Sequence, residues 1–332
     1  MGHAKGDEQI YNNGLKTMAL NGQLICIFGG GGFLGRYIAQ KLLARGARVR
    51  IAERNIKNAM HIKPLGDLGQ TQFASADVTK AESVKRAVSR CDVVINLAGV
   101  FGSEMKNVNE MGAANVAEAA GTEGIQSLIH MSAIGADAAS PALYGRSKAA
   151  GEVAVQNAFS NAIILRPSII FGREDQFINR FAGLIQMLPV VPIISGDTKF
   201  QPIFVGDIAE AVVNALENPS QYAGKIFELG GPEIMSMGEL NRRIAKMIGR
   251  DRSFVEIPDF AAKIIATCTG FLPGAPITKD QYLMLQKDNV VSDTAKGLTL
   301  FGVSPTPLAA VAHGWMERYA DHGRFGVGAK AG

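Results

Sequence analysis

Short apolar runs alternate with stretches of helical periodicity along the first half of the chain. Six segments have the apolar or alternating pattern that is typical of β-strands, at 24–28, 47–52, 72–76, 92–97, 126–131 and 161–165. Between the first two, Leu34, Ile38 and Leu42 recur at helical spacing. Further helices are predicted at 81–90 and 107–120. Strands that alternate with helices in this way favour an α/β fold with a parallel sheet.

The second half of the chain contains fewer and shorter apolar runs. A helix predicted over 174–188 carries five apolar residues at helical spacing, namely Phe177, Phe181, Leu184, Ile185 and Leu188. We interpret this face first as core and only second as a wall for a substrate. Helix 207–217, strand 226–229 and helix 237–248 are expected to complete a smaller lobe, with a closing helix over 308–319.

One segment of the second half, 257–275, is mostly apolar and contains a single cation, Lys263. Pro258 and Pro273 bound it, and it is too short and too interrupted to span a bilayer. One interpretation is a core helix that packs on the smaller lobe. The other is an apolar surface that meets a membrane protein or lipid headgroups, or that covers a lipophilic substrate.

These patterns predict how the chain is divided. The expected parts are a flexible extension over 1–22, a nucleotide-binding domain over 23–172 with parts of 200–230, a smaller lobe over 173–320 and a flexible tail over 321–332. No stretch reaches the roughly 18 uncharged apolar residues that a membrane-spanning helix needs. We therefore expect no transmembrane segment.

Composition narrows the classes of function. Hydrophobic residues make up 47% and charged residues 19% of the 332 residues, which indicates a globular protein. The net charge of +4 comes without a basic block, so nucleic-acid binding is not expected. The three cysteines are far apart and the five histidines have no metal-binding spacing, which favours reduced thiols in the cytoplasm and no metal.

The stretch FGGGGFLGRYI at 28–38 joins the first strand to the first helix. Glycines at Gly29, Gly32 and Gly35 permit a tight turn and a close approach of the backbone to a pyrophosphate. Amide groups at the helix N-terminus then face the anion. The run also matches G-x-G-x-x-G through Gly30, but glycine turns join strands to helices for packing alone as well. The strand before it and the helix after it favour dinucleotide binding.

Cofactor choice is expected at Glu53 and Arg54, about 20 residues beyond the glycine turn. A carboxylate there accepts hydrogen bonds from the ribose hydroxyls of NAD, whereas a guanidinium pairs with the 2′-phosphate of NADP. Lys57 and Arg36 add cations nearby, so we favour NADP(H) and keep NAD(H) as the alternative. The other interpretation of Arg36 and Lys57 is that they are solvated helix-face charges.

Ser132 follows the fifth strand, at the edge where doubly wound sheets bind ligands. Twelve residues later, Tyr144 and Lys148 form a Y-x-x-x-K pattern that stacks both side chains on one helical face. A nearby ammonium group is expected to lower the pKa of the tyrosine towards neutrality and to bond the nicotinamide ribose. Read alone, the pattern is also that of an ordinary exposed helix.

Small or polar residues follow two further strands. Asp77 and Val78 are expected to face the adenine, and Leu97, Ala98 and Gly99 permit the backbone to pass close to a cofactor. As isolated residues, the last three indicate only a turn.

Together these motifs resemble the extended and atypical short-chain dehydrogenase/reductase superfamily, which includes epimerase- and dehydratase-like proteins. GGGGFLG, Asp77-Val78, NLAG, Ser132, YGRSK and LRPSIIFG at 165–172 contribute to the resemblance, which runs from about residue 24 to 247. It implies a Rossmann-like doubly wound parallel sheet with a smaller C-terminal α/β lobe. It also implies that the backbone of 165–172 lies along the nicotinamide.

The resemblance and the motifs together predict the site residues. Ser132, Tyr144 and Lys148 are the expected catalytic residues. The expected cofactor-binding residues are Gly29, Gly31, Gly32, Phe33, Leu34, Gly35, Arg36, Glu53, Arg54, Asp77, Val78, Leu97, Ala98, Gly99, Met131, Ser132, Tyr144, Lys148, Arg166, Pro167, Ile169 and Ile170.

A narrower resemblance concerns FGRED at 171–175, KFQPIFVGDIAEAVVNAL at 199–216 and APITKD at 275–280. These segments are similar to the accessory subunit of respiratory complex I that is itself a short-chain-dehydrogenase relative, and to its bacterial relatives. That subfamily implies a tightly held NADPH, a structural role beside the complex and, in related proteins, a membrane-associated ubiquinone pathway. The expected location is the cytoplasm, with a peripheral place at the inner face of the respiratory membrane as the alternative.

One departure from the superfamily pattern concerns the strand-end hydroxyl. Active members commonly carry a run such as S-S-S or S-S-A there, and aligning that run places Ala133 at the key position. Ser132 is then one residue, and one face, away from the substrate. Two functions stay open: an NADP(H)-binding protein whose nucleotide is structural or slowly turned over, and an active NAD(P)-dependent oxidoreductase or epimerase that acts on a nucleotide-sugar or quinone-pathway substrate.

Overall fold

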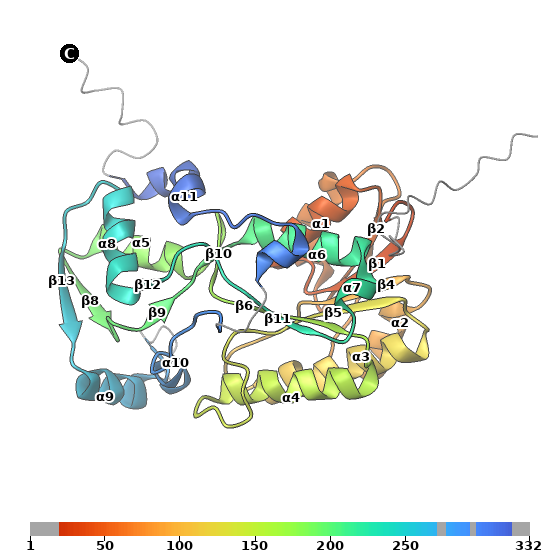
Figure 1. Cartoon of the computed structure of the whole chain (residues 1–332), viewed down its shortest axis with the longest axis horizontal. Coiled ribbons are helices and arrows are strands. Elements are labelled where there is room, and N and C mark those ends of the chain that lie inside the picture. The colour runs from red at the N-terminus through yellow and green to blue at the C-terminus, as the bar shows by residue number, and fades with distance from the viewer. Residues whose placement is uncertain (1–19, 271–276, 293–296, 321–332) are drawn as a thin grey trace, which may run out of the picture.

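The computed structural model describes residues 20–270, 277–292 and 297–320. The expected tail over 321–332 and nearly all of the extension over 1–22 lie outside these residues, as does the end of the apolar segment 257–275. Two unequal parts are visible in Figure 1: a large sheet covered by helices, and a smaller lobe on its left.

The large sheet has seven strands in the order β11-β6-β5-β4-β1-β2-β3, and every neighbouring pair is parallel. Its strands are β1 Leu24–Phe28, β2 Arg48–Glu53, β3 Thr71–Ser75, β4 Val93–Asn96, β5 Ser127–Met131, β6 Ile163–Pro167 and β11 Ile226–Leu229. The prediction of a Rossmann-like doubly wound parallel sheet is confirmed. The carboxyl ends of these strands form the edge at which such sheets bind ligands.

Helices cover both faces because successive side chains of each strand point to opposite sides. Ile25 and Ile27 of β1 lie in one apolar cluster with helices α1 Phe33–Ala44 and α6 Val205–Glu217. Cys26 and Phe28 lie in a second cluster on the other face. The helices on that face are α2 Ala81–Val88, α3 Gly112–Thr122 and α4 Leu143–Ala158.

The smaller lobe has its own apolar core, formed by three helices and a two-stranded sheet. These elements are α5 Ile178–Met187, α8 Met237–Met247, α11 Leu308–Met316, β8 Val190–Ile194 and β13 Ser253–Ile257. Two more helices, α9 Asp259–Thr269 and α10 Lys279–Met284, lie below this lobe near the start of α4 in Figure 1.

The remaining elements are short. Two are paired strands, β7 Ile170–Phe171 with β10 Ile203–Phe204 and β9 Lys199–Phe200 with β12 Met235–Ser236. The others are α7 Pro219–Tyr222 and the 3-10 or π segments η1 Ile56–Leu65, η2 Lys106–Met111, η3 Leu298–Phe301 and η4 Glu317–Tyr319.

Three expectations about the elements need correction. Strand 226–229 is the edge strand of the large sheet and helix 207–217 packs against α1, so neither belongs to the smaller lobe. The helix expected over 174–188 begins only at Ile178, because the Asp175 carboxylate accepts hydrogen bonds from the Phe177 and Ile178 amides and so forms the start of the helix. The helix expected over 107–120 begins with the π-helical turn η2.

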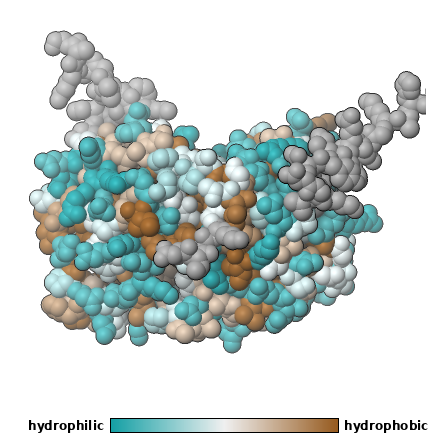
Figure 2. Space-filling model, in the orientation of Figure 1, coloured by the Kyte–Doolittle hydropathy of each residue, from teal (hydrophilic) through white to brown (hydrophobic). Residues whose placement is uncertain are grey.

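The two interpretations of the apolar segment 257–275 each describe one face of α9. Ala262 and Ala266 are buried in an apolar cluster with α10, whereas Phe260 is 69% and Ile264 is 58% exposed. Figure 2 shows a mainly hydrophilic face on which apolar residues gather in scattered groups. Of the helices in the described part of the chain, none is long and apolar enough to cross a bilayer.

We predict that Gly35→Ala lowers the free energy of unfolding by about 2–3 kcal/mol. A Cβ atom at Gly35 would lie 2.5 Å from the carbonyl oxygen of Gly29 and from Cα of Gly30, and these backbone atoms cannot move aside locally. Urea unfolding measures the change. Gly183→Ala in α5 is the matched control, because no atom lies within 4 Å of its added Cβ and the same substitution should stabilise that helix by about 0.5–1 kcal/mol. Equal stability of the two variants would contradict the prediction.

Candidate functional site

The glycine turn after β1 brings the start of α1 against the ends of β1 and β4. Gly29 adopts a positive φ of 74°, and a Cβ there would lie 3.2 Å from the carbonyl carbon of Leu97. Helix α1 begins after Gly32, which provides no side-chain cap, and its first turn contains no acidic residue. The first amides of α1, beginning at Phe33 and Leu34, therefore lack acceptors within the helix and lie at the ligand-binding edge of the sheet.

Glu53, at the end of β2, reaches back to the glycine turn. The amide of Gly31 donates a hydrogen bond of 2.9 Å to Oε1 of Glu53. Segment η1 closes the same side, since a Cβ at Gly31 would lie 2.9 Å from the Cβ of Ala59. A carboxylate therefore lies beside the turn, where an adenosine ribose is bound in this type of fold.

The structure does not bring all three cations expected around a 2′-phosphate, Arg36, Arg54 and Lys57, together at the end of β2. Arg54 is exposed, and its guanidinium has no hydrogen bond or ion pair within the residues that the structure describes. Arg36 instead pairs with Glu174, with Nη1 and Oε1 3.3 Å apart, and the Tyr37 hydroxyl donates to the same carboxylate at 2.8 Å. Lys57 is exposed on η1. Arg54 is thus the cation that adjoins the end of β2.

Asp77 and Val78 follow β3 in a compact turn. Oδ1 of Asp77 accepts hydrogen bonds from the amide and the hydroxyl of Thr79 at 3.0 and 2.8 Å. Burial raises the pKa of Asp77, but these bonds and the charges of Lys80 and Arg54 outweigh it, so that the pKa lies below its usual value. Val78 is buried. Asp77 is therefore an anionic neighbour of Arg54 at this edge.

Leu97, Ala98 and Gly99 follow β4, and Gly99 lies beside Lys148 of α4. The Asn96 side chain accepts a hydrogen bond from the Ala98 amide at 3.1 Å. A Cβ at Gly99 would lie 3.0 Å from Nζ of Lys148, so the absence of a side chain at Gly99 makes room for the ammonium group.

Lys148 is the buried cation of the site. The residue is only 4% exposed, and its Nζ donates a hydrogen bond of 3.0 Å to the carbonyl oxygen of Met131. Burial lowers the pKa of Lys148 to about 8, although the charge of Glu152 opposes the change. Nζ lies 6.0 Å from the centre of the Tyr144 ring, so the structure brings the expected pair together with the end of β5.

The expectation that Lys148 lowers the pKa of Tyr144 is wrong for this conformation. Burial raises the pKa of Tyr144 to about 12. Phe101, which is itself 58% exposed, stacks on the tyrosine ring with the two centroids 4.3 Å apart and the planes 17° apart. The Lys148 ammonium is directed to a backbone carbonyl, and so the phenol stays protonated at neutral pH.

Two buried polar atoms at the end of β5 lack a hydrogen-bond partner among the described residues, namely Oγ of Ser132 and Nε2 of His130. His130 faces Asn96 on the neighbouring strand, with Nδ1 and Nδ2 3.2 Å apart. Burial, with a smaller contribution from Lys148, lowers the pKa of His130 to about 3, so the imidazole is neutral. His130 is not among the residues expected from the sequence, although its spacing of two from Ser132 places both on one face of the strand.

Asn109 is a second residue that sequence analysis missed. It is buried in the π-helical turn η2, and its side chain bonds the amide of Val100 at 2.9 Å and the carbonyl of Val100 at 3.0 Å. Its Nδ2 also donates to the hydroxyl of Ser147 at 3.0 Å. Asn109 therefore ties the loop after β4 to α4. A π-helical turn is the local signal, but no residue pattern in the sequence predicts one.

The segment expected along a nicotinamide lies beside Ser132. The amide of Ser132 donates to the carbonyl of Leu165 at 2.7 Å, and that of Ile134 donates to Pro167 at 3.0 Å. Ile169 and Ile170 follow, and Ile170 begins β7. The backbone of this segment thus adjoins the candidate catalytic hydroxyl.

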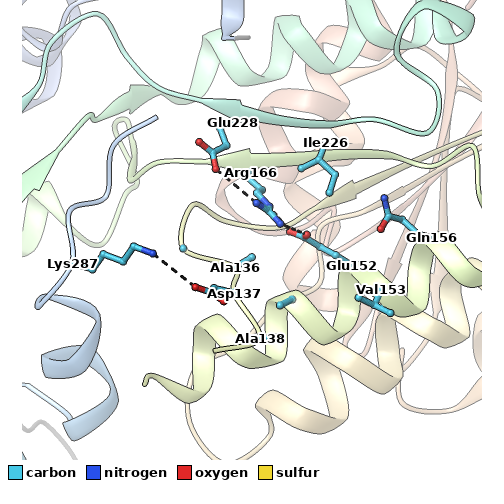
Figure 3. A pocket seen from close by; sticks show the side chains of 12 residues that line it. Ala136, Asp137, Ala138, Glu152, Val153, Gln156, Arg166, Ile226, Glu228 and Lys287 are labelled. Carbon is cyan, nitrogen blue, oxygen red and sulfur yellow. Dashed lines mark hydrogen bonds and ion pairs between the residues drawn. The ribbon is translucent and has the colours of Figure 1, made fainter. Parts of the chain in front are cut away.

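The Arg166 side chain is engaged by carboxylates. Nε and Nη2 donate to the two oxygens of Glu152 at 2.8 and 2.6 Å, and Nη1 lies 3.7 Å from Glu228. Figure 3 shows these groups in a cavity of about 490 Å³ beside α4, with Lys287 and Asp137 3.9 Å apart at its side. The assignment of Arg166 to the cofactor stays a prediction. Its guanidinium is engaged by Glu152 and Glu228, so a contact with the cofactor would have to come from the backbone of Arg166.

The described residues contain no group of three or more His, Cys, Asp or Glu side chains that could hold a metal ion.

Comparison with known proteins agrees with the motifs. A family model described as the NAD dependent epimerase/dehydratase family matches residues 25–230. Subunit 9 of the mitochondrial NADH dehydrogenase (ubiquinone) 1 alpha subcomplex of Rattus norvegicus is 37% identical over 300 residues, covering 87% of this chain and 78% of that protein. The 40 kDa subunit of the mitochondrial NADH-ubiquinone oxidoreductase of Neurospora crassa is 29% identical over 328 residues, covering 96% and 85%.

A solved structure with the same fold is DesIV, a dTDP-glucose 4,6-dehydratase from Streptomyces venezuelae that contains bound NAD. The two chains superpose with a TM-score of 0.70 at 16% identity, covering 90% of this chain and 96% of the other. At this identity the likeness concerns the fold alone. The sequence matches confirm the resemblance to the superfamily and to the complex I accessory subunit.

We predict that stability depends on pH through Lys148. The folded-state pKa of about 8 lies below the value of 10.5 for an ordinary lysine, so between these values the unfolded chain binds more protons. Wild-type stability should therefore gain up to about 3 kcal/mol relative to Lys148→Met as pH rises through this window. Urea unfolding at pH 7, 8, 9 and 10 measures the difference.

Lys85→Met, on the exposed side of α2, reports the effect of the same substitution at the surface. A difference between wild type and Lys148→Met that stays constant with pH, or that moves in favour of the variant, would show that Lys148 is not a desolvated cation.

Proposed function

We propose that this chain, which belongs to the NAD dependent epimerase/dehydratase family, binds NADP(H) at the carboxyl edge of the large sheet, and that the nucleotide mainly stabilises the fold. The observation that supports binding most strongly is the uncapped start of α1, held against the ends of β1 and β4 by the turn at Gly29. Amide donors without acceptors at such a position suit a diphosphate.

The residues around this edge fit a dinucleotide. The turn has no room for side chains of its own, because added Cβ atoms at Gly30, Gly31 and Gly35 would lie within 3 Å of the Ile51 side chain, the Cβ of Ala59 and the Gly29 backbone, respectively. At the other end, the buried hydroxyl of Ser132 has no partner among the described residues, and it lies on the strand whose last carbonyl holds Lys148. A ligand that spans the edge from α1 to α4 would satisfy donors at both ends.

The preference for NADP(H) depends on Arg54. Its guanidinium is exposed at the end of β2 and is free of ion pairs within the described part of the chain, so it is available for a 2′-phosphate. Glu53 opposes this preference, since its carboxylate accepts from Gly31 close by and would repel a phosphate. Glu53 is the observation that favours the alternative, NAD(H).

The state of Tyr144 supports slow or absent turnover. Its phenol, with a pKa of about 12, is a poor base at neutral pH, and the ring of Phe101 covers one face of it. A bound nicotinamide would supply the hydride chemistry of the family. The residues around it would then chiefly bind and orient the ring, and the nucleotide would act as a ligand of the native state.

An active oxidoreductase or epimerase is the second candidate function, with a nucleotide-sugar or a quinone-pathway compound as substrate. It is favoured by the free hydroxyl of Ser132 and by the pKa of about 8 at Lys148, which permits proton exchange near neutral pH. In this function Ser132 would orient the substrate and Tyr144 would transfer the proton.

The relatives also support a partner. Because proteins 37% and 29% identical over most of the chain are subunits of mitochondrial NADH-ubiquinone oxidoreductases, we propose that this chain associates with respiratory complex I at the inner face of the respiratory membrane. The exposed Phe260 and Ile264 of α9 are apolar side chains that such an association would cover.

We predict that the purified protein releases NADP(H) when it is denatured, as identified by chromatography and absorbance. Added NADPH at about 100 times its Kd should raise the free energy of unfolding by about 2.7 kcal/mol, measured by thermal or urea unfolding. Inorganic pyrophosphate serves as the comparison for a non-specific anion. Neither released nucleotide nor stabilisation by NADPH would contradict the proposal.

The Tyr144→Phe variant separates the two functions within the same experiment. It should bind NADPH as tightly as wild type does, and neither protein should oxidise NADPH with a panel of nucleotide-sugars, aldehydes and quinones. Turnover by wild type that Tyr144→Phe abolishes would instead establish the enzyme.

We predict opposite effects of two substitutions at the end of β2. Arg54→Ala should weaken NADPH binding about tenfold or more and leave NADH binding nearly unchanged, because only the 2′-phosphate loses a charged partner. Glu53→Gln should strengthen NADPH relative to NADH, because it removes a repulsive carboxylate. Isothermal titration with both nucleotides measures the ratio, and equal weakening of both by Arg54→Ala would contradict the NADP(H) preference.

A further inference from the structure

Helix α4 carries two of the candidate catalytic residues, Tyr144 and Lys148, but has no cap of its own. Its N-cap residue is Ala142, whose side chain cannot accept a hydrogen bond. Tyr144 lies in the first turn, where the amides of Leu143 and Tyr144 have no acceptor within the helix. The position of the tyrosine therefore depends on an acceptor from another part of the chain.

Asp280 provides that acceptor from a segment 136 residues away in sequence. Oδ1 accepts from the amide of Leu143 at 2.5 Å, and Oδ2 accepts from the amide of Tyr144 at 3.2 Å. A carboxylate in this place satisfies two free donors and also interacts favourably with the helix dipole. Figure 1 shows α10, which carries Asp280, beside the start of α4.

Helix α10 is itself held in a fixed place. A capping box joins Thr278 and Gln281, with hydrogen bonds of 3.0 and 3.2 Å. The Tyr282 hydroxyl donates to both oxygens of Asp259 at 2.9 Å and so joins α10 to the start of α9. Asp280 thus caps α4 from helix α10, which is itself anchored to α9 beside the smaller lobe.

A second contact from the same segment reaches the candidate catalytic loop. Oδ1 of Asn289 accepts a hydrogen bond of 2.7 Å from the hydroxyl of Ser168, and its Nδ2 donates to the carbonyl of Ile134, two residues after Ser132, at 3.5 Å. The Asn289 amide donates to Lys199 at 2.8 Å. Residues 277–292 therefore contact both α4 and the loop after β5.

We infer that Asp280 is a positioning residue through which the smaller lobe sets the place of Tyr144, and thereby the affinity for the nicotinamide half of the nucleotide. This assignment rests on the nucleotide function proposed above. Phe101, stacked on Tyr144, and Asp280 border one cavity of about 510 Å³ between α10, α9 and the loop after β4. A change in the position of α9 and α10 would thus reach Tyr144 directly.

The inference predicts an effect confined to one half of the ligand. Without the Asp280 carboxylate the first turn of α4 frays, whereas Lys148 is held one turn further on by Met131. The glycine turn lies in a different connection, between β1 and α1. Asp280→Ala should therefore weaken NADPH about fivefold, the equivalent of one lost cap, and leave 2′,5′-ADP, which lacks the nicotinamide half, unchanged. Asp280→Asn keeps one acceptor and should lie between wild type and Asp280→Ala.

Isothermal titration of the full chain with NADPH and with 2′,5′-ADP measures this ratio. Ser236→Ala is the matched control, because it removes the capping box of α8 in the smaller lobe and should lower stability without altering the ratio. Equal weakening of both ligands by Asp280→Ala, or no weakening of NADPH, would overturn the inference. Failure of wild type to bind either ligand would instead contradict the proposed function.

Hydrogen exchange on the nucleotide-free protein tests the cap independently. Amides of the peptide over 142–149 should exchange faster in Asp280→Ala than in wild type, with Asp280→Asn between them and Ser236→Ala unchanged. Unaltered exchange in Asp280→Ala would overturn the inference whether or not the protein binds nucleotide.

Discussion

Helix α1 begins almost in contact with the end of β1, because Gly35 has only a hydrogen atom where a methyl group would lie 2.5 Å from the backbone of Gly29 and Gly30. This close approach aims the first amides of α1 at the carboxyl edge of the sheet. It also places the apolar side of α1 on the cluster that contains Ile25 and Ile27. The same packing that stabilises the first domain therefore creates the donor group to which a dinucleotide binds in this family.

The opposite end of the edge is built from polar groups that the fold leaves poorly satisfied. Lys148 is buried with a single backbone acceptor, His130 is held neutral, and the Ser132 hydroxyl has no partner among the described residues. Each of these features costs stability, since buried polar groups are normally paired. A native-state ligand would offset that cost, and so a tightly held nucleotide with a structural role is physically consistent with the site.

The two parts of the molecule are joined where the candidate site lies. Residues 277–292 contribute the Asp280 carboxylate to α4 and the Asn289 side chain to Ser168, while Arg36 of α1 pairs with Glu174 beyond β7. All three contacts join helices or a strand end of the large part to segments at or near the smaller lobe. The candidate site at the sheet edge and the smaller lobe are consequently joined by short-range bonds, which suits a chain whose relatives are subunits of a larger complex.

Local pattern determined the parallel sheet, the glycine turn and the neighbouring placement of Tyr144 and Lys148 on one helix, because burial, turns and helical stacking repeat over a few residues. The tertiary structure decided which charges meet. Arg36 pairs with Glu174, Arg166 pairs with Glu152, and burial rather than Lys148 controls the pKa of Tyr144. It also decided that Asp280 caps α4. Some of these partners, such as Arg36 with Glu174 and Asp280 with Leu143, are more than a hundred residues apart and come together only when whole helices and strands pack. The periodicity of the sequence contains no information on such long-range pairs.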